Sequence, residues 1–308
     1  MKKTRVSVFG KRLLGRGQSV IDLHSHSTAS DGSLSPGDLL RAASACGISA
    51  LALTDHDTLA GLPEAASTAA ALGIRFISGI ELEITSMDAV PDREAASFWP
   101  PGEFHLLGLG IEKPGPAFLG AIAGQAEQRE ARNAEILARF PALGIEADYA
   151  EVQAFAGGKI VGRPHFAALL VRRKIARNTQ QAFDRYLGRG KPLYVPKKGL
   201  AFTEAAEYIH GAGGLAVLAH PMSLYLSWGR LPAFIAALQG RGLDGIEAWH
   251  PTAKLRACRR LEDLGRRLGL VITAGSDFHG AGRPDRKLGY TAGNREIDES
   301  FLAGIPFI

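Results

Sequence analysis

Histidines and carboxylates gather at the ends of apolar runs in this 308-residue chain. His24 and His26 are two residues apart, so in a strand their side chains point to the same side and can bind one ion. Comparable polar groups end other apolar runs: Asp55, His56 and Asp57; Glu81 and Glu83; His220; and Asp277 with His279. Imidazole and carboxylate ligands without thiolates suit Zn²⁺, Mn²⁺ or Fe²⁺.

More than six candidate ligands exceed the needs of a single tetrahedral ion, so the set predicts a cluster of two or three divalent ions. Metal coordination lowers the pKa of water from about 15.7 to about 7, which supplies a hydroxide nucleophile near neutral pH. The sequence therefore favours hydrolysis by attack of a metal-bridging hydroxide, without a side-chain nucleophile.

Seven short apolar runs are expected to be the strands that position these groups. They begin at Val20, Ile48, Ile74, Phe104, Leu215, Gly245 and Leu270. Helical patterns lie between them at 36–46, 58–72, 203–212, 231–238 and 253–268. Alternating strands and helices predict a parallel α/β fold, and seven units favour a distorted barrel with its site at the carboxyl ends of the strands.

Residues 112–198 break this rhythm and predict an inserted helical subdomain that acts as a substrate lid. Helices are expected at 116–140, 164–174 and 179–187. The predicted barrel domain then comprises 20–111 and 199–308, preceded by a basic, disordered tail at 1–19.

The net charge of +5 is unevenly distributed. The tail carries +6, residues 150–200 carry +9 and the remainder carries −10. An acidic remainder suits a multi-cation site, and a basic insertion suits a phosphorylated substrate, so we expect a small phosphate ester rather than bulk nucleic acid. No RNA-binding signature or basic stretch interleaved with aromatic residues occurs along the sequence.

Only two cysteines occur, Cys46 and Cys258, and neither lies in a metal-type pair, so we expect a reducing, cytoplasmic location. No run of 18 apolar residues indicates a membrane span. No stable protein partner is evident.

Six motifs, in chain order, resemble the PHP (polymerase and histidinol phosphatase) family, in particular its small bacterial phosphoesterases. The motifs are HSHSTASDGSLSP, ALTDHDTLAG, GIELE, FHLLGLG, LAHP and SDFH. The match extends from Val20 to about Gly289, and it implies a distorted (β/α)7 barrel with a trinuclear metal centre.

The resemblance also implies a set of nine metal ligands. They are His24, His26, Asp31, His56, Glu81, His105, His220, Asp277 and His279. His105 differs from the others because it opens its apolar run instead of closing it. Between Glu83 and His105 the chain departs from the family in a long loop with Pro91, Pro100 and Pro101.

The insertion supplies the predicted substrate-binding residues. Arg129, Arg132 and Asn133 share one helix face, which could instead be a solvated face paired with neighbouring glutamates. The family has an arginine-containing helix near its site, which favours phosphate binding. Arg163 and His165, in GRPH, resemble a phosphate-binding element of the family. His250, after Trp249, could lie behind the metal ligands or contact substrate, but a structural role is favoured.

The most similar subfamily removes the 3′-phosphate of nucleoside 3′,5′-bisphosphates, and related members trim short RNA from the 5′ end. The resemblance thus implies a metal-dependent phosphoesterase, with Mn²⁺ as the expected metal. Three alternatives stay open: a histidinol-phosphate-type phosphatase, an amidohydrolase-like enzyme acting on C–N bonds, and a non-catalytic metal- or RNA-binding module.

Overall fold

The structure is a computed structural model that describes residues 19–88, 99–156 and 160–306. Of the predicted basic tail, only Ser19 belongs to the described part, so the expected disorder of residues 1–18 is not addressed. Pro91 of the long loop also lies outside the described residues.

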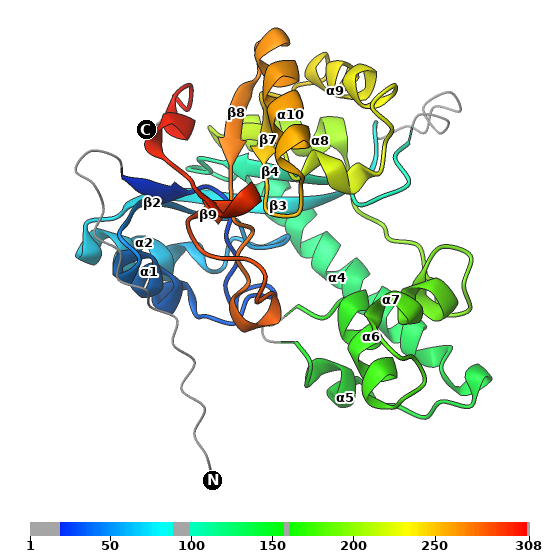
Figure 1. Cartoon of the computed structure of the whole chain (residues 1–308). Coiled ribbons are helices and arrows are strands. Elements are labelled where there is room, and N and C mark those ends of the chain that lie inside the picture. The colour runs from blue at the N-terminus through cyan, green and yellow to red at the C-terminus, as the bar shows by residue number, and fades with distance from the viewer. Residues whose placement is uncertain (1–18, 89–98, 157–159, 307–308) are drawn as a thin grey trace.

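Seven strands form one curled sheet, in the order β1-β2-β3-β4-β6-β7-β8 (Figure 1). Their bounds are β1 Val20–Asp22, β2 Ile48–Leu53, β3 Arg75–Ser86, β4 His105–Leu109, β6 Leu215–Leu218, β7 Gly245–Trp249 and β8 Val271–Ala274. A short strand, β5 (Leu200–Ala201), pairs with β3, while β9 (Tyr290–Thr291) and β10 (Arg295–Glu296) form a separate ribbon. All seven predicted strands are present, and the distorted α/β barrel is confirmed.

The expectation of an all-parallel sheet is wrong at β4, which runs antiparallel to both β3 and β6. Parallel neighbours need a long crossover connection, usually a helix, and no helix lies between β3 and β4 in the described part of that connection. The reversal explains why His105 opens its strand and still lies near the centre. As the first residue of β4, it pairs with Glu83 near the carboxyl end of β3. The expectation that Glu81 ends its strand is also wrong, because Glu81 lies inside β3, which continues to Ser86.

Five helices cover the outside of the sheet, close to their predicted positions. They are α1 Pro36–Ala45, α2 Leu62–Leu72, α8 Phe202–Gly211, α9 Leu231–Gln239 and α10 Leu255–Arg267. The Ser35 hydroxyl accepts a hydrogen bond from the amide of Asp38, as expected of an N-cap. Helix α10 packs Cys258, Leu261 and Leu264 into the main core. Short 3-10 helices lie at Pro221–Leu224, Gly280–Gly282, Ala292–Asn294 and Glu299–Leu302.

The insertion is helical and lies to one side of the sheet (Figure 1). It comprises α4 Pro116–Ala138, a 3-10 turn at Pro141–Leu143, α5 Tyr149–Gln153, α6 Arg163–Arg172, α7 Thr179–Ala182 and a π-helical turn at Phe183–Leu187. Phe140, Phe166 and Leu169 belong to an apolar cluster distinct from the barrel core. This cluster supports the division at residues 112 and 198, which stays a prediction. No helix in the described ranges combines the length and hydropathy required for a membrane span.

Backbone contacts join the two ends of the curled sheet next to the predicted ligands. Ser25, after β1, forms a parallel bridge with Phe278, after β8. The carboxylate of Asp22 accepts hydrogen bonds from the amides of Ser276 and Gly289 at 2.9 and 2.8 Å. At Gly275 the chain approaches so closely that a Cβ atom would lie 2.3 Å from the Cβ of His24. The seam therefore fixes His24 relative to the loop that carries Asp277.

We expect Gly275→Ala to lower the free energy of unfolding by about 1–3 kcal/mol, because overpacking forces buried neighbours to move. Urea unfolding followed by circular dichroism measures this change. Gly120→Ala is the matched control, since its Cβ would meet open space on α4 and the change should stabilise by about 0.5–1 kcal/mol. Equal stability of the Gly275→Ala variant and the unmodified protein would contradict the close approach.

Candidate metal centre

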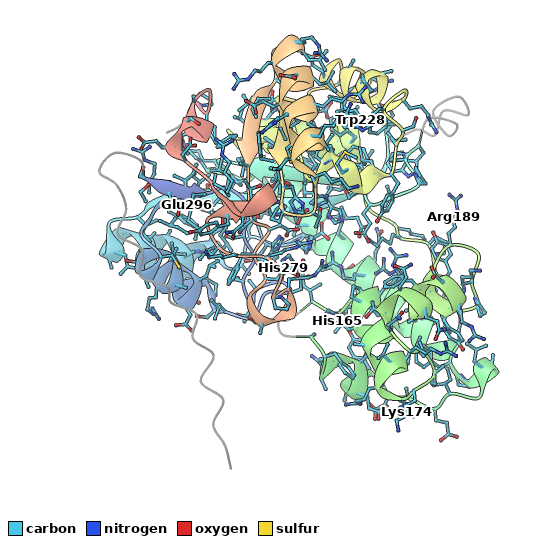
Figure 2. All side chains as sticks on the ribbon, in the orientation of Figure 1. His165, Lys174, Arg189, Trp228, His279 and Glu296 are labelled. Carbon is cyan, nitrogen blue, oxygen red and sulfur yellow. The ribbon has the colours of Figure 1, made fainter. Side chains whose placement is uncertain are left out.

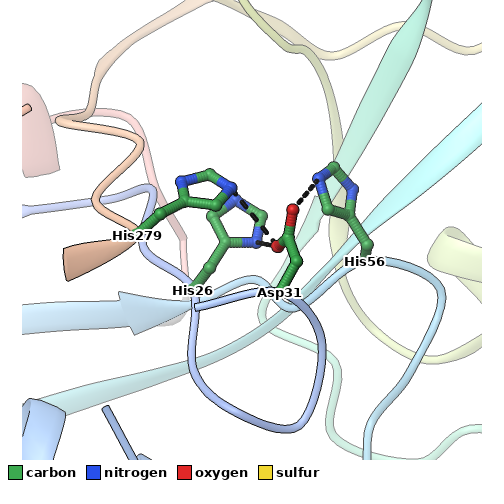
Figure 3. A group of neighbouring side chains, drawn as sticks. All are labelled: His26, Asp31, His56 and His279. Atoms are coloured by element: carbon green, nitrogen blue, oxygen red, sulfur yellow. Dashed lines mark ion pairs between the residues drawn. The ribbon is translucent and has the colours of Figure 1, made fainter. Parts of the chain in front are cut away.

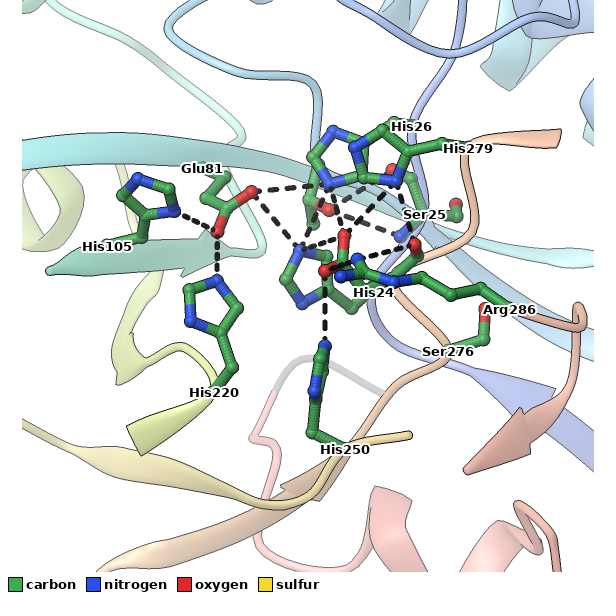
Figure 4. A network of polar contacts seen from close by, with 12 residues as sticks. His24, Ser25, His26, Glu81, His105, His220, His250, Ser276, His279 and Arg286 are labelled. Atoms are coloured by element: carbon green, nitrogen blue, oxygen red, sulfur yellow. Dashed lines mark hydrogen bonds and ion pairs between the residues drawn. The ribbon is translucent and has the colours of Figure 1, made fainter. Parts of the chain in front are cut away.

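The centre is built around one buried carboxylate. The Glu81 side chain is 1% exposed, and both of its oxygens contact imidazole nitrogens (Figure 4). Oε2 lies 3.3 Å from His24 Nε2, 3.2 Å from His26 Nε2 and 3.2 Å from His56 Nδ1. Oε1 lies 2.9 Å from both His105 Nδ1 and His220 Nε2. Strand β3 therefore brings together five histidines from four separate segments of the chain.

The first potential ion position has four ligand atoms, from His24, His26, Glu81 and Asp277. The imidazole Nε2 atoms of His24 and His26 are 3.1 Å apart, and they lie 3.5 and 3.2 Å from Asp277 Oδ1. Ligands about 2.0–2.1 Å from a tetrahedral ion are about 3.3–3.4 Å from one another. These separations therefore fit one divalent cation.

The second potential position surrounds Asp31 (Figure 3). Its Oδ1 lies 3.3 Å from His279 Nε2 and 3.8 Å from His26 Nδ1, while Oδ2 lies 4.0 Å from His56 Nε2. His26 Nδ1 is buried without a hydrogen-bond partner among the described residues. A buried nitrogen left unpaired next to a carboxylate is the arrangement that a bound cation would satisfy.

The third potential position comprises His56, Glu81 and His105. His220 lies against Glu81 Oε1, the oxygen that also contacts His105. The structure therefore gathers all nine predicted ligands into one connected group. Their donor chemistry fits two or three divalent cations, and their assignment as ligands stays a prediction.

Hydrogen bonds orient several of these imidazoles. His24 Nδ1 lies 3.0 Å from Glu247, His220 Nδ1 lies 2.7 Å from Ser223 Oγ, and His279 Nδ1 lies 2.8 Å from the Asp277 carbonyl. In each case Nε2 is left to face the centre, as metal-binding histidines require. Sequence analysis missed Glu247, although it lies in the sixth apolar run.

Burial and neighbouring charges also shift the pKa values of the candidate ligands. Burial lowers the pKa of His56 to about 3 and that of His279 to about 4, so both imidazoles are neutral at pH 7 and keep a lone pair for an ion. Although burial opposes the change, Glu247 and Glu81 raise the pKa of His24 to about 10. This shift reports a negative field at His24, which a divalent cation would also neutralise.

Asp277 is held from the side opposite to its ligand oxygen. Its Oδ2 forms an ion pair with Arg286 and lies 3.1 Å from His250 Nε2, so Oδ1 faces the first position. Asp277 has a left-handed backbone with φ of 50°, a strained conformation often found at functional sites. His250 therefore belongs to the polar network around the centre, and the choice between a structural role and a role beside the metal ligands stays a prediction. Sequence analysis also missed Arg286, which lies outside the motifs that were singled out.

A second buried carboxylate, Asp55, shapes the turn that carries Asp31. It accepts hydrogen bonds from the Ser27 amide at 2.7 Å, the Ser27 hydroxyl at 2.6 Å and the Ser30 hydroxyl at 2.5 Å. At Gly32 a Cβ atom would lie 2.5 Å from the His26 carbonyl oxygen, so the turn needs glycine.

Two of the predicted substrate residues line a small polar cavity beside the centre. The lining residues are Asp57, Glu83, Gln125, Gln128, Arg129, Arg132 and Lys198. Arg129 forms an ion pair with Asp57, the neighbour of His56. Arg132 is 9% exposed, and its buried Nε has no hydrogen-bond partner among the described residues. An unpaired guanidinium N–H in a polar cavity suits an anionic ligand.

The other three predicted substrate residues lie where the insertion meets the barrel. Asn133 is buried and donates a hydrogen bond to the Val161 carbonyl at 2.9 Å, which fixes the segment before α6. Arg163 lies 3.6 Å from Glu103 of the barrel. His165 Nδ1 accepts from the Gly162 amide at 2.9 Å, and Figure 2 shows this histidine on the side of the insertion nearest the barrel. Their roles with substrate stay predictions.

Known proteins that are similar to this chain identify its family. The PHP domain model matches residues 22–189. The chain belongs to the PHP family. A 5′-3′ exoribonuclease of Haemophilus influenzae is 35% identical over 84% of this PHP chain and 89% of its own length. A 3′,5′-nucleoside bisphosphate phosphatase of Chromobacterium violaceum is 34% identical over 88% of this chain and 91% of its own length.

Solved structures agree with this assignment. An amidohydrolase from Chromobacterium violaceum, with bound sulfate and no metal, is 32% identical with a TM-score of 0.77, covering 91% of this chain and 92% of its own. A Bifidobacterium adolescentis chain assigned as a metal-dependent phosphoesterase is 27% identical with a TM-score of 0.73, covering 93% and 95%. The recognised resemblance is confirmed, and this PHP chain is a metal-dependent phosphoesterase.

We expect Glu81→Gln to lower the number of bound divalent ions, because the change removes the negative charge shared by five imidazoles. Inductively coupled plasma mass spectrometry after loading with Mn²⁺ measures the metal-to-protein ratio. Glu112→Gln, at an exposed site outside the network, is the control. An unchanged ratio in the Glu81 variant would contradict its assignment as a metal ligand.

We expect Arg286→Met to weaken metal binding about 10- to 100-fold, since partners that orient a ligand contribute roughly this much. Arg286→Lys should recover part of the affinity because it keeps the cation beside Asp277 Oδ2. Competition with a fluorescent chelator measures the constants, and Arg267→Met on the exposed face of α10 is the control. Identical affinities across the series would show that Arg286 does not position Asp277.

Proposed function

We propose that this PHP phosphoesterase hydrolyses phosphate monoesters, most specifically the 3′-phosphate of nucleoside 3′,5′-bisphosphates, and also trims short RNA from its 5′ end. One observation carries the proposal: a cavity containing Arg129, Arg132 and Lys198 adjoins a centre that fits divalent cations. A substrate with two phosphates can place one at each position. The names of the Haemophilus and Chromobacterium relatives support this substrate class.

The nine-residue centre is proposed to hold two or three divalent ions, with Mn²⁺ as the preferred metal and Zn²⁺ or Fe²⁺ as alternatives. When bound, the ions would supply an activated water and neutralise charge on the phosphoryl group. Glu81 would be shared between positions, because its two oxygens face different sets of histidines. Asp31 and Asp277 would add a carboxylate to the outer positions.

The second phosphate is proposed to bind on the insertion. Arg132 offers an unpaired N–H group in the cavity, and guanidinium groups bind phosphate oxygens through paired hydrogen bonds. His165 accepts from the Gly162 amide through Nδ1, so a neutral ring carries its proton on Nε2. That proton can be donated to a phosphate oxygen. Arg163, close to Glu103, would close the insertion over the substrate as a lid.

We place the reaction in the cytoplasm, which the two free thiols, Cys46 and Cys258, support. The proposed partner is the small nucleotide or oligoribonucleotide itself. A C–N hydrolase is the second candidate, because the Chromobacterium structure is described as an amidohydrolase. The cations around the cavity favour phosphate over a neutral amide.

The substrate assignment is tested by phosphate release from adenosine 3′,5′-bisphosphate with Mn²⁺. The Asp277→Ala variant should lose at least about 100-fold in kcat, because it removes a ligand and with it an ion position. The same variant should still bind an oligoribonucleotide if the protein were only a binding module. Release of ammonia from amide substrates without phosphate release would favour the C–N hydrolase.

We expect Arg132→Met to raise KM for adenosine 3′,5′-bisphosphate about 10- to 100-fold, in line with the loss of hydrogen bonds between charged groups. KM for p-nitrophenyl phosphate, which has no second phosphate, should stay unchanged. Gln128→Met, on the same cavity wall, is the control for altered packing. Equal increases in KM for both substrates would contradict a separate subsite for the second phosphate.

A further inference from the structure

A cation-rich surface lies beside the centre and outside the insertion. Between residues 251 and 261 the chain carries Lys254, Arg256, Arg259 and Arg260 and no acidic residue. All four side chains are exposed. They lie just before and within the first half of α10, which begins five residues after His250, whose ring contacts Asp277. The surface therefore begins at the edge of the centre.

Among the residues that the structure describes, these cations lack the carboxylate partners that stabilise the later part of the same helix. Further along α10, Arg266 pairs with Glu262 at 2.7 Å. In the described part of the chain, no carboxylate forms an ion pair with Lys254, Arg256, Arg259 or Arg260. Arg256 precedes Arg259 and Arg260 by three and four residues, and like charges at this spacing destabilise a helix. An external anion would offset this repulsion.

Aromatic side chains accompany the cations. The Arg260 guanidinium lies 4.1 Å from the ring centroid of Trp228, which Figure 2 labels. On the same loop, Tyr225 is 77% exposed and has a left-handed backbone with φ of 53°. This loop follows His220, so it also starts at the centre. Trp228 is partly buried and pairs with Arg260, whereas Tyr225 is exposed. Aromatic rings together with cations are the features by which proteins stack the bases of single strands.

We propose that these six residues, the rim surface, bind a single-stranded RNA whose 5′ end occupies the centre. The rim surface comprises Tyr225, Trp228, Lys254, Arg256, Arg259 and Arg260. The proposal rests on the proposed function for the placement of the 5′ end. RNA fits better than an acidic protein because phosphates spaced along a strand meet the arginines while bases meet the rings. The fold thus assembles a platform that no single stretch of sequence contains.

The test measures binding of a short 5′-phosphorylated oligoribonucleotide, labelled with fluorescein at its 3′ end, to the metal-free full chain by fluorescence anisotropy. EDTA prevents cleavage. The variants are Arg256→Gln/Arg259→Gln/Arg260→Gln and, separately, Tyr225→Ala. A matched control, Arg177→Gln/Arg189→Gln/Lys191→Gln, removes the same charge from exposed positions of the insertion. Circular dichroism confirms that each variant is folded.

We expect the rim triple variant to bind RNA about 10-fold more weakly and to lose about 2 from the slope of log affinity against log salt, since each phosphate contact contributes about 0.7. Tyr225→Ala should weaken binding about 5-fold or more, as loss of one stacked base predicts. Phosphate release from adenosine 3′,5′-bisphosphate should be unchanged in both, so failure of this proposal is distinct from failure of the proposed function.

Equal losses in the insertion control would show a general charge effect and overturn the proposal. Unchanged RNA binding in the rim variants would also overturn it. Competition by a polyglutamate peptide as effective as that by RNA would assign the rim surface to an acidic protein instead.

Discussion

The buried carboxylate of Glu81 is the constraint on which the rest of the structure depends. Five imidazoles lie within 3.3 Å of its two oxygens, and they come from β1, β2, β4 and β6 or from the residues that follow these strands. The carboxylate lies inside a strand in the middle of the sheet, so a rigid backbone fixes it. Although burial opposes the change, charge interactions and hydrogen bonds with the neighbouring imidazoles hold the pKa of Glu81 well below its usual range.

The insertion adds a second layer of electrostatic order around this centre. Arg129, Lys197 and Arg163 each pair with a barrel carboxylate, namely Asp57, Glu83 and Glu103. Each of these carboxylates lies within two residues of a candidate ligand: His56, Glu81 and His105, respectively. A phosphate entering the cavity would compete with Asp57 for Arg129, which lines the cavity. Substrate affinity and the position of the insertion are thereby coupled in the proposed function.

Much of this arrangement could be predicted from sequence because its signals are local. Seven apolar runs, most of which end in His, Asp or Glu, identified all seven strands, and the order of the motifs identified the family. The direction of β4 could not be predicted, since a run of apolar residues does not encode which way it pairs. The antiparallel pairing explains how His105, at the start of its strand, reaches Glu81.

Residues that act through other residues were also hard to predict. Arg286 and Glu247 contact ligands only after the fold brings them together, and neither lies at a recognised motif position. The rim surface was hidden for a similar reason, because its aromatic and cationic members come from separate segments and its charge was averaged into an acidic remainder.

In the proposed function, two phosphates of one substrate bind at two adjoining positions, one at the centre and one on the insertion. The most direct test compares kcat/KM for adenosine 3′,5′-bisphosphate with that for adenosine 3′-monophosphate, using the Mn²⁺-loaded protein. The account predicts a preference for the bisphosphate of about 10-fold or more, as one lost set of charged hydrogen bonds implies. Equal values for the two nucleotides, or no phosphate release from either, would contradict it.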